Sequence, residues 1–158
     1  GRRAGYVFRP INNWILNKIQ IHRNKDANAD FYRKGRLAAI GMAGKLKNGE
    51  VVGLTGDQLL REGIKVPFFG IDTPTPQAAA VMALKWKVPI YMVRVERFKG
   101  MKFKMSVENE LKIPKNLEKD KAVHQITRLI SSRIEEWIID KPEQWLWAHR
   151  RWGKTNQT

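Results

Sequence analysis

Apolar and polar positions along the chain predict a mixed succession of strands and helices. Short apolar runs typical of buried strands occur at residues 6–8, 51–54 and 88–93. Apolar residues at helical spacing predict helices over residues 11–23, 34–47, 76–86 and 121–141, the last ending at Pro142. Strands that alternate with helices are typical of a parallel sheet. We therefore expect a single α/β domain over residues 1–158, a mostly parallel twisted sheet flanked by helices.

Two further patterns refine this expectation. Residues 102–107 alternate strictly between lysine or serine and apolar side chains, and Gly100 precedes them, so a hairpin is predicted between this strand and residues 88–93. The helix over residues 34–47 is rich in glycine and alanine, which would allow it to pack closely on the sheet.

The stretch from residue 51 to 76 carries the most informative side chains. Its strand stops at Gly56, and Asp57 and Gln58 would lie at the carboxyl end, where ligands of α/β sheets gather. Phe68 and Phe69 follow, between Pro67 and Gly70, in what reads as a rigid apolar loop. Adjacent phenylalanines in such a loop usually face a partner, a ligand or the core.

The charge balance narrows the class of partner. Thirty basic against 15 acidic residues give a formal net charge of +15, which attracts nucleic acid, anionic lipid or an acidic carrier protein equally well. The chain has no cysteine, which excludes disulfides and thiolate metal sites, and its three histidines are too widely spaced to predict a zinc cluster. No apolar run approaches the ~20 residues that span a bilayer.

Several segments together resemble the bacterial lipid A biosynthesis acyltransferases, the lauroyl and myristoyl transferases within the glycerolipid acyltransferase superfamily. They are residues 8–10 (FRP), 12–13 (NN), 57–58 (DQ), 66–70 (VPFFG), 73–75 (TPT), 142–147 (PEQWLW) and 149–152 (HRRW). The resemblance covers nearly the whole chain. It implies the C-terminal part of an acyltransferase domain, acting at the cytoplasmic face of the bacterial inner membrane. The reaction it implies moves an acyl group from acyl carrier protein to a hydroxyl of a phosphorylated lipid A precursor, without metal or redox cofactor.

The resemblance also assigns candidate site residues. It makes Arg9 an anion ligand at a strand end, and it matches Arg23, at the end of the first helix, to a second arginine of the family. Asn13 and Gln58 fall in matching segments and are candidate substrate ligands. Either arginine could instead be an ordinary surface residue.

The chemical nature of Asp57, Phe68 and Phe69 also suggests a role for each side chain. Asp57 would orient Arg9 or Arg23, or bind a sugar hydroxyl; the alternative is a helix cap or turn aspartate. Phe68 and Phe69 could line an apolar channel for the acyl chain. We expect Arg9 and Asp57 to act on the same polar end of the substrate site, because both follow predicted strands.

The family's catalytic motif is a histidine separated by four residues from a carboxylate, the histidine acting as general base on the acceptor hydroxyl. His22 has Asp26 after only three residues, and neither His124 nor His149 has a carboxylate at the required spacing. In the family this motif precedes the segment that matches residues 8–10. We therefore expect the catalytic base to lie before Gly1, in a longer chain, and residues 1–158 alone to be inactive.

Near the end of the chain, Trp145, Trp147 and Trp152 alternate with basic residues. This composition fits a membrane interface, a surface on which nucleic-acid bases stack, or a tail packed on the sheet. The resemblance favours the membrane, with salt-sensitive binding, and no nucleic acid is expected as a partner. A basic nucleic-acid-binding module and a catalytically silent lipid-binding relative are the alternatives.

Overall fold

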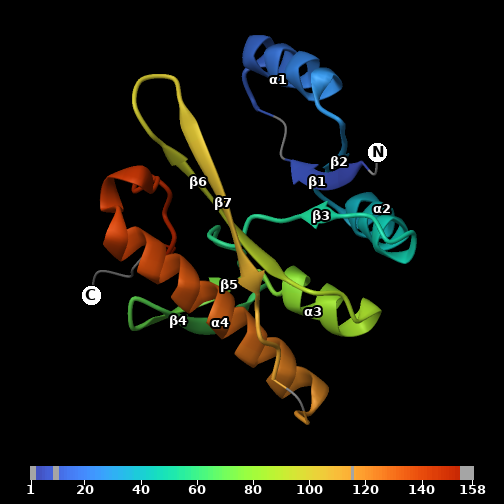
Figure 1. Ribbon diagram of the computed structural model, residues 1–158, viewed down its shortest axis with the longest axis vertical. Coiled ribbons are helices and arrows are strands. Elements are labelled where there is room, and N and C mark those ends of the chain that lie inside the picture. The colour runs from blue at the N-terminus through green and yellow to red at the C-terminus, as the bar shows by residue number, and fades with distance from the viewer. Residues whose placement is uncertain (1–2, 9–10, 115, 154–158) are drawn as a thin grey trace. The chain divides into compact units, whose positions relative to one another are not determined.

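The computed structural model describes residues 3–8, 11–114 and 116–153. They form two compact units, Gly1–Leu54 and Thr55–Thr158, whose elements are labelled in Figure 1. The two are called here the N-terminal and the C-terminal unit and are described in turn.

The N-terminal unit contains a small parallel sheet with two helices. In chain order its elements are β1 (Ala4–Phe8), α1 (Trp14–Asp26), β2 (Ala29–Arg33), α2 (Arg36–Lys47) and β3 (Val52–Gly53). Strand β1 lies in the middle and pairs in parallel with both β2 and β3. Parallel neighbours need a crossover connection between them, and the helices α1 and α2 provide it.

Close packing of α2 on β2 depends on a missing side chain. A Cβ at Gly41 would lie 2.3 Å from the Tyr32 ring, closer than atoms can approach, whereas one at Gly44 would have nothing within 4 Å. The prediction that small residues allow this helix to pack tightly on the sheet is therefore confirmed at Gly41.

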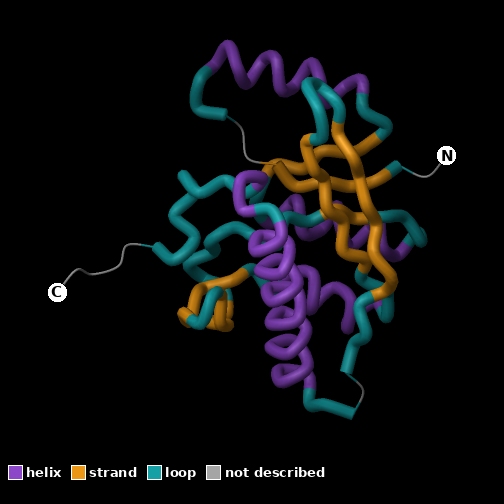
Figure 2. The backbone as a smooth tube through the Cα atoms, turned by 60° about the vertical axis from the view of Figure 1, so that its left-hand side comes forward, coloured by secondary structure: helices purple, strands orange, loops and turns teal. Residues whose placement is uncertain are grey.

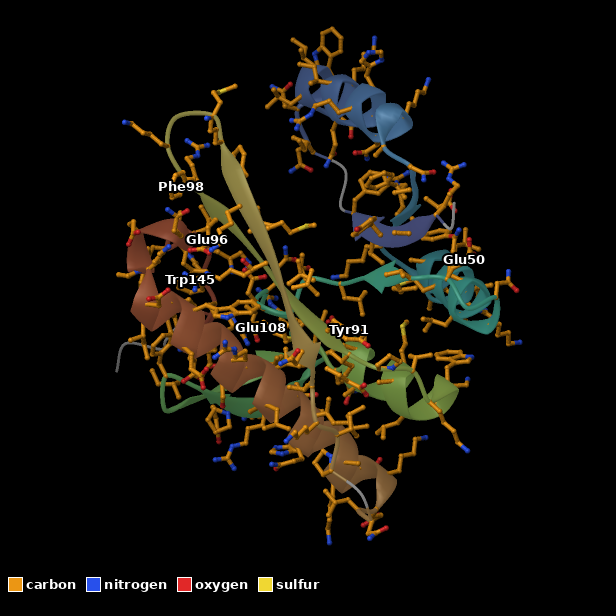
Figure 3. The ribbon with its side chains drawn as sticks, in the orientation of Figure 1. Glu50, Tyr91, Glu96, Phe98, Glu108 and Trp145 are labelled. Carbon is orange, nitrogen blue, oxygen red and sulfur yellow. The ribbon has the colours of Figure 1, made fainter. Side chains whose placement is uncertain are left out.

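A buried lysine joins the elements of this unit. Lys45 donates hydrogen bonds to the Arg3 carbonyl at 3.3 Å and to Glu50 at 3.1 Å, and it pairs with Asp30. The hydrogen bond from Lys45 lowers the pKa of Asp30, against the opposing effect of desolvation. Glu50 is labelled in Figure 3.

The C-terminal unit combines two antiparallel hairpins with helices α3 and α4. Figure 2 distinguishes the helices, strands and loops of the chain by colour. Its elements are β4 (Ile64–Phe68), β5 (Ile71–Thr75), α3 (Ala78–Trp86), β6 (Tyr91–Arg97), β7 (Phe103–Glu110), α4 (Lys119–Asp140) and the 3-10 helix η1 (Pro142–Gln144). The predicted hairpin between residues 88–93 and 102–107 is confirmed by β6 and β7.

The core of this unit follows one face of α4. The predicted apolar stripe is buried at Val123, Ile126, Ile130, Ile134 and Ile138, together with Phe68, Ala80 and Met92 from the neighbouring elements. Burying such a stripe contributes about 1.5–3 kcal/mol for each large apolar side chain. The helix ends at Asp140, two residues before Pro142, because proline disfavours helical geometry in the residue before it.

The α/β class is confirmed, but the mostly parallel sheet is not. Within the described residues only β1, β2 and β3 are parallel, and β4–β5 and β6–β7 are separate antiparallel pairs. The expected rigid loop at residues 66–70 is the end of a hairpin. Phe69 and Gly70 both have positive φ, 51° and 75°, as a two-residue turn of type I′ requires. The sequence did not predict this hairpin, because both of its strands contain a proline, which usually argues against a strand.

Two smaller differences concern the N-terminal unit. Strand β2 was not predicted, and the strand expected over residues 51–54 is only the pair Val52–Gly53.

No helix among the described residues is long and apolar enough to cross a bilayer.

Candidate functional site

The β4–β5 hairpin presents its two adjacent phenylalanines in opposite ways. Side chains alternate between the two faces of a strand, so Phe68 is turned inward and is fully buried, whereas Phe69 lies in the turn with 36% of its surface exposed. The two rings still meet edge to face, with centroids 5.1 Å apart. Of the pair, only Phe69 offers ring surface to a ligand.

A buried arginine holds the inner face of this hairpin. Arg151 donates from Nη2 to the Thr75 hydroxyl at 2.7 Å and from Nη1 to the Pro74 carbonyl at 3.2 Å. Its Cζ lies 4.6 Å from the centre of the Phe68 ring, a cation–π contact. The side chain is fully buried, and its Nε has no hydrogen-bond partner.

Burial also sets the electrostatics of this arginine. Desolvation lowers the pKa of Arg151, and the negative charges of Asp57 and Glu135 oppose that shift. Asp57 is therefore one source of the field that keeps a guanidinium charged inside the C-terminal unit.

Two tryptophans complete the packing around Phe68. The rings of Trp145 and Trp152 lie 5.9 and 5.6 Å from the Phe68 ring, and Trp152 Nε1 donates to the Phe68 carbonyl at 3.1 Å. Of the three readings of this tail, packing onto a sheet is therefore confirmed for these two residues. Trp147 remains 55% exposed, with its indole N–H bonded to the Pro142 carbonyl.

The predicted polar residues of the 57–58 segment occupy a bend. Asp57 is half-buried and Gln58 is exposed. Because β3 already ends at Gly53, the expectation that Asp57 lies at the end of a strand is wrong. The short strand follows from its neighbourhood, since β3 pairs with β1 at only two positions, Gly5 with Val52 and Tyr6 with Gly53.

The candidates from the N-terminal unit are placed in part. Asn13 caps α1, its Oδ1 accepting from the backbone N–H groups of Ile15 and Leu16 at 3.0 and 3.2 Å. This bond gives Asn13 a structural role, independent of any ligand. Arg23 is exposed in the last turn of the same helix, where a cation is favoured by the helix dipole. Arg9 lies outside the described residues, so its expected meeting with Asp57 stays a prediction.

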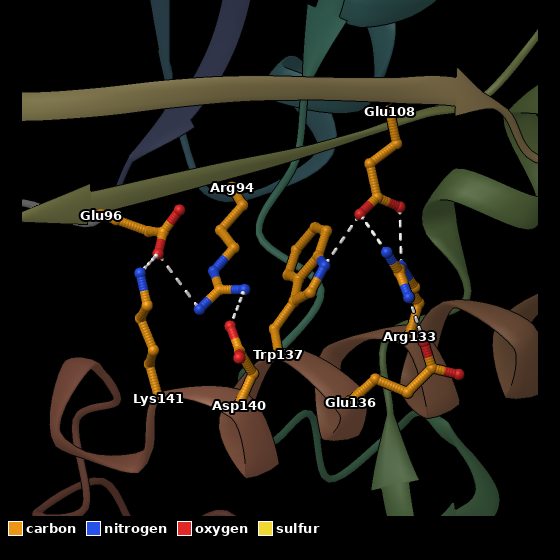
Figure 4. A network of polar contacts seen from close by, with 8 residues as sticks. All are labelled: Arg94, Glu96, Glu108, Arg133, Glu136, Trp137, Asp140 and Lys141. Carbon is orange, nitrogen blue, oxygen red and sulfur yellow. Dashed lines mark hydrogen bonds and ion pairs between the residues drawn. The ribbon is translucent and has the colours of Figure 1, made fainter.

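A second polar cluster joins β6 and β7 to α4 (Figure 4). Glu108 accepts hydrogen bonds from Arg133 Nε at 2.7 Å and from Trp137 Nε1 at 2.9 Å, and Arg94 binds Asp140 at 2.9 Å. Lys141 bonds Glu96 at the end of the helix. The hydrogen bond from Arg133 lowers the pKa of Glu108, and that from Lys141 lowers the pKa of Glu96. Each carboxylate is occupied by a cation of this chain, so the cluster is structural.

The C-terminal unit also has a cavity of about 330 Å³ between β4, α3 and the start of α4. Its lining combines the polar side chains of Gln77, Asp120 and His124 with apolar ones. His124 Nε2 lies 3.1 Å from the Lys65 carbonyl oxygen. Within the described ranges, no three His, Asp or Glu side chains are grouped closely enough to hold a metal ion.

Arg151 is the residue that the sequence did not single out. It belonged to a run of basic and aromatic residues that reads as surface, and its neighbour Arg150 is indeed exposed. Composition cannot tell which of two adjacent arginines turns inward. The flanking tryptophans indicate an aromatic environment that suits a guanidinium group, but they flank Arg150 and Arg151 equally and so do not distinguish the two.

Comparison with known proteins extends this picture. The family model described as "Bacterial lipid A biosynthesis acyltransferase" matches residues 1–154. A protein of Escherichia coli (strain K12), "Lipid A biosynthesis palmitoleoyltransferase", is 26% identical in an alignment over 151 residues that covers 92% of this chain and 46% of that protein. A protein of Shigella flexneri, "Lipid A biosynthesis acyltransferase", matches to the same extent. The chain thus spans about half the length of these relatives.

Proposed function

Since this chain belongs to the bacterial lipid A biosynthesis acyltransferase family, we propose that it is part of an enzyme that transfers a fatty acyl group from acyl carrier protein to a lipid A precursor. The observation that carries the proposal is the family match over residues 1–154, combined with a coverage of 46% of each relative. The match supports acyl transfer as the chemistry, and the partial coverage is consistent with a chain that holds only part of the enzyme.

The reaction forms an ester and releases a thiol. A hydroxyl oxygen of the acceptor attacks the thioester carbonyl of the donor, a general base takes the hydroxyl proton, and the carrier's thiolate leaves and is protonated. The thioester is already activated, so no metal or redox cofactor is needed. In the proposal the base is the histidine of a His-x4-Asp/Glu motif outside this chain.

Residues 1–158 would supply binding and orientation. Arg9 and Arg23 would hold phosphate or carbonyl oxygens of the substrates, with Asn13 and Gln58 as further polar ligands. Asp57 would orient an arginine, and the field that it exerts on Arg151 supports a role in holding guanidinium groups. The exposed ring of Phe69 would contact the acyl chain, while buried Phe68 fixes the hairpin that carries it.

The charge of the chain fits the proposed partners. Acyl carrier protein is acidic and the acceptor is phosphorylated, so both would be attracted by a net charge of +15. The same charge favours the anionic cytoplasmic face of the inner membrane as the place of work.

Acyl transfer measured with the full-length protein tests the proposal. Radiolabelled acyl groups on acyl carrier protein should appear in a phosphorylated glycolipid acceptor, and residues 1–158 alone should give no transfer. A full-length protein that binds the acceptor but never acylates it would instead be the silent lipid-binding relative. Transfer by the 158-residue chain that is lost in His22→Ala would place the base within this chain and contradict the assignment made here.

A further inference from the structure

The β6–β7 hairpin has its polar face turned toward α4 and its apolar face turned away. Arg94, Glu96 and Glu108 project toward the helix and are bonded to it (Figure 4). On the other face Val93 pairs with Val107, and Val95 with Met105, and all four are exposed. A hairpin that only covered the core would show the reverse pattern.

The apolar face continues into the end of the hairpin, residues 97–104, called here the hairpin tip. Phe98 is 75% exposed and Met101 is 94% exposed, and Phe103 is exposed beside them. Figure 3 marks Phe98 at the end of the hairpin. Large apolar side chains gathered at such exposure mark an interaction site.

The backbone holds this tip in a defined shape. Gln144 of η1 bonds both backbone groups of Arg97, at 3.1 Å to its N–H and 3.3 Å to its carbonyl. Beyond that anchor, Phe98 N–H bonds the Lys102 carbonyl at 2.8 Å, and Gly100 turns the chain with φ of 62°. The apolar side chains are therefore presented on a fixed loop.

The charges of the tip select its partner. Its basic residues are Arg97, Lys99, Lys102 and Lys104, all exposed, and it contains no acidic residue. Glu96, the nearest acid in the chain, is buried and paired with Lys141. Apolar side chains at the end of a loop, ringed by cations, match the layering of an anionic bilayer, with acyl chains beneath negative headgroups.

We propose that the hairpin tip is a membrane-contacting element that inserts Phe98, Met101 and Phe103 among the lipids of an anionic bilayer. The lysines and Arg97 bind the headgroups around them. This surface would hold the protein at the membrane where its proposed acceptor lies, but the contact itself does not depend on acyl transfer.

The bilayer is favoured over other partners of a basic surface. Duplex nucleic acid would be contacted by the cations, but it takes up an apolar side chain only as a wedge between base steps, whereas this tip exposes Phe98, Met101 and Phe103 together. In a dimer through this surface, the four cations of one hairpin tip would face the same four cations of the second copy and repel them. Trp147 and Leu146 of the tail are also exposed, but the Trp147 ring packs edge to face on Trp145 and its indole N–H is bonded to the Pro142 carbonyl.

The chain has no cysteine, so one can be introduced as a single site for a probe. In the 158-residue chain, Met101→Cys is labelled with an environment-sensitive fluorophore and titrated with vesicles of phosphatidylcholine and phosphatidylglycerol. We expect a blue shift with these vesicles and none with pure phosphatidylcholine. Lipids with a quencher on the acyl chain should quench the probe, and salt should reverse the shift.

Two controls make the test specific. Ile139→Cys places the same probe at an exposed apolar site among acidic residues of α4, and it should not respond. Lys99→Gln with Lys102→Gln should weaken vesicle binding by about thirtyfold, whereas Lys119→Gln with Lys121→Gln, the same change of charge at the start of α4, should weaken it much less. Matching melting temperatures exclude misfolding as the cause.

Three results would overturn the proposal. The first is sedimentation of the chain with anionic vesicles while the probe at position 101 stays unshifted, which assigns binding to another surface. The second is a response of the probe to duplex DNA as strong as that to vesicles, and the third is a response to rising protein concentration alone. Loss of acyl transfer in the full-length protein leaves all of these readouts unaffected, so the proposed function and this contact fail separately.

Discussion

The guanidinium of Arg151 lies over the ring of Phe68, with Cζ 4.6 Å from the ring centre. A residue near the end of the described chain thus holds the hairpin β4–β5 from inside, through one aromatic contact and two hydrogen bonds to β5. The cation thus adds to the support that the hairpin receives from Trp145, Trp152 and the core residues of α4.

Replacing Arg151 should therefore cost stability. Arg151→Ala removes the cation–π contact and leaves the Thr75 hydroxyl and the Pro74 carbonyl without their donor, a loss of about 2–4 kcal/mol in the free energy of unfolding. Arg150→Ala, at the exposed neighbour, should change it by no more than about 0.5 kcal/mol. Urea unfolding of the two variants checks this. Equal midpoints would show that Arg151 is not buried as described.

The two phenylalanines of the hairpin should separate stability from substrate contact. Phe68→Ala opens a cavity in the core and should lower the free energy of unfolding by about 3–5 kcal/mol. Phe69→Ala should lower it by only about 1–2 kcal/mol, because the ring is partly exposed. In the full-length enzyme, Phe69→Ala should raise the requirement for acyl donor or shift the preferred chain length. If Phe68→Ala shifts that preference without destabilising the fold, the channel runs on the other face of the hairpin.

Helix α2 offers a matched pair of glycines. Gly41→Ala should destabilise the chain by about 1–3 kcal/mol, because its Cβ would meet the Tyr32 ring. Gly44→Ala, in the same helix with open space, should stabilise it by about 0.5–1 kcal/mol through helix propensity. Thermal unfolding measures both. The same sign for the two variants would contradict the close approach of α2 to β2.

Acid should weaken the attachment of the β6–β7 hairpin. The pKa of Glu108 is lowered in the folded chain by Arg133 and Trp137, so its contribution is complete above the ordinary glutamate pKa of about 4.3 and is lost as the pH falls through the lowered value. Glu108→Gln should be less stable than the natural chain at neutral pH, and the difference should shrink below about pH 4. A difference independent of pH would show that the carboxylate charge is not involved.

For the full-length enzyme, Arg9 and Asp57 are predicted to act together. Arg9→Ala and Asp57→Ala should each reduce turnover, and the double variant should lose less than the sum of the two free-energy losses, as coupled residues do. Additive losses would place them at separate points. If Asp57→Ala leaves turnover intact but lowers the melting temperature, the carboxylate serves Arg151 alone.

The elements that could be predicted from the sequence are distributed unequally between the two units. Helices α2, α3 and α4 and the β6–β7 hairpin follow from spacing and from Gly100, because those signals are local. The β4–β5 hairpin was hidden by Pro67 and Pro74, which usually argue against a strand but are tolerated at the edge of a two-stranded pair. Strand β2, with Asp30 and Arg33 in five residues, shows no apolar run and owes its place to pairing with β1.

The candidate site was reached only in part for the same reason. Phe68, Phe69 and Asp57 were found from local composition and from resemblance. Arg151 was missed, because its partners Pro74 and Thr75 lie 77 and 76 residues away in the chain and only folding brings them together. Phe68 and Phe69 have opposite roles because a turn with two positive φ angles follows Phe68. The sequence Phe-Gly does not predict such a turn.

That separation of 76 residues between Thr75 and Arg151 has a consequence for how the protein is made. A ribosome releases β4 and β5 well before it adds the arginine that holds them. Until α3 and α4 follow, the pair is an isolated two-stranded hairpin, which is only marginally stable in water. Phe68 therefore lacks its core partners until α4 has been made, and the hairpin gains its internal cation only after that helix is complete.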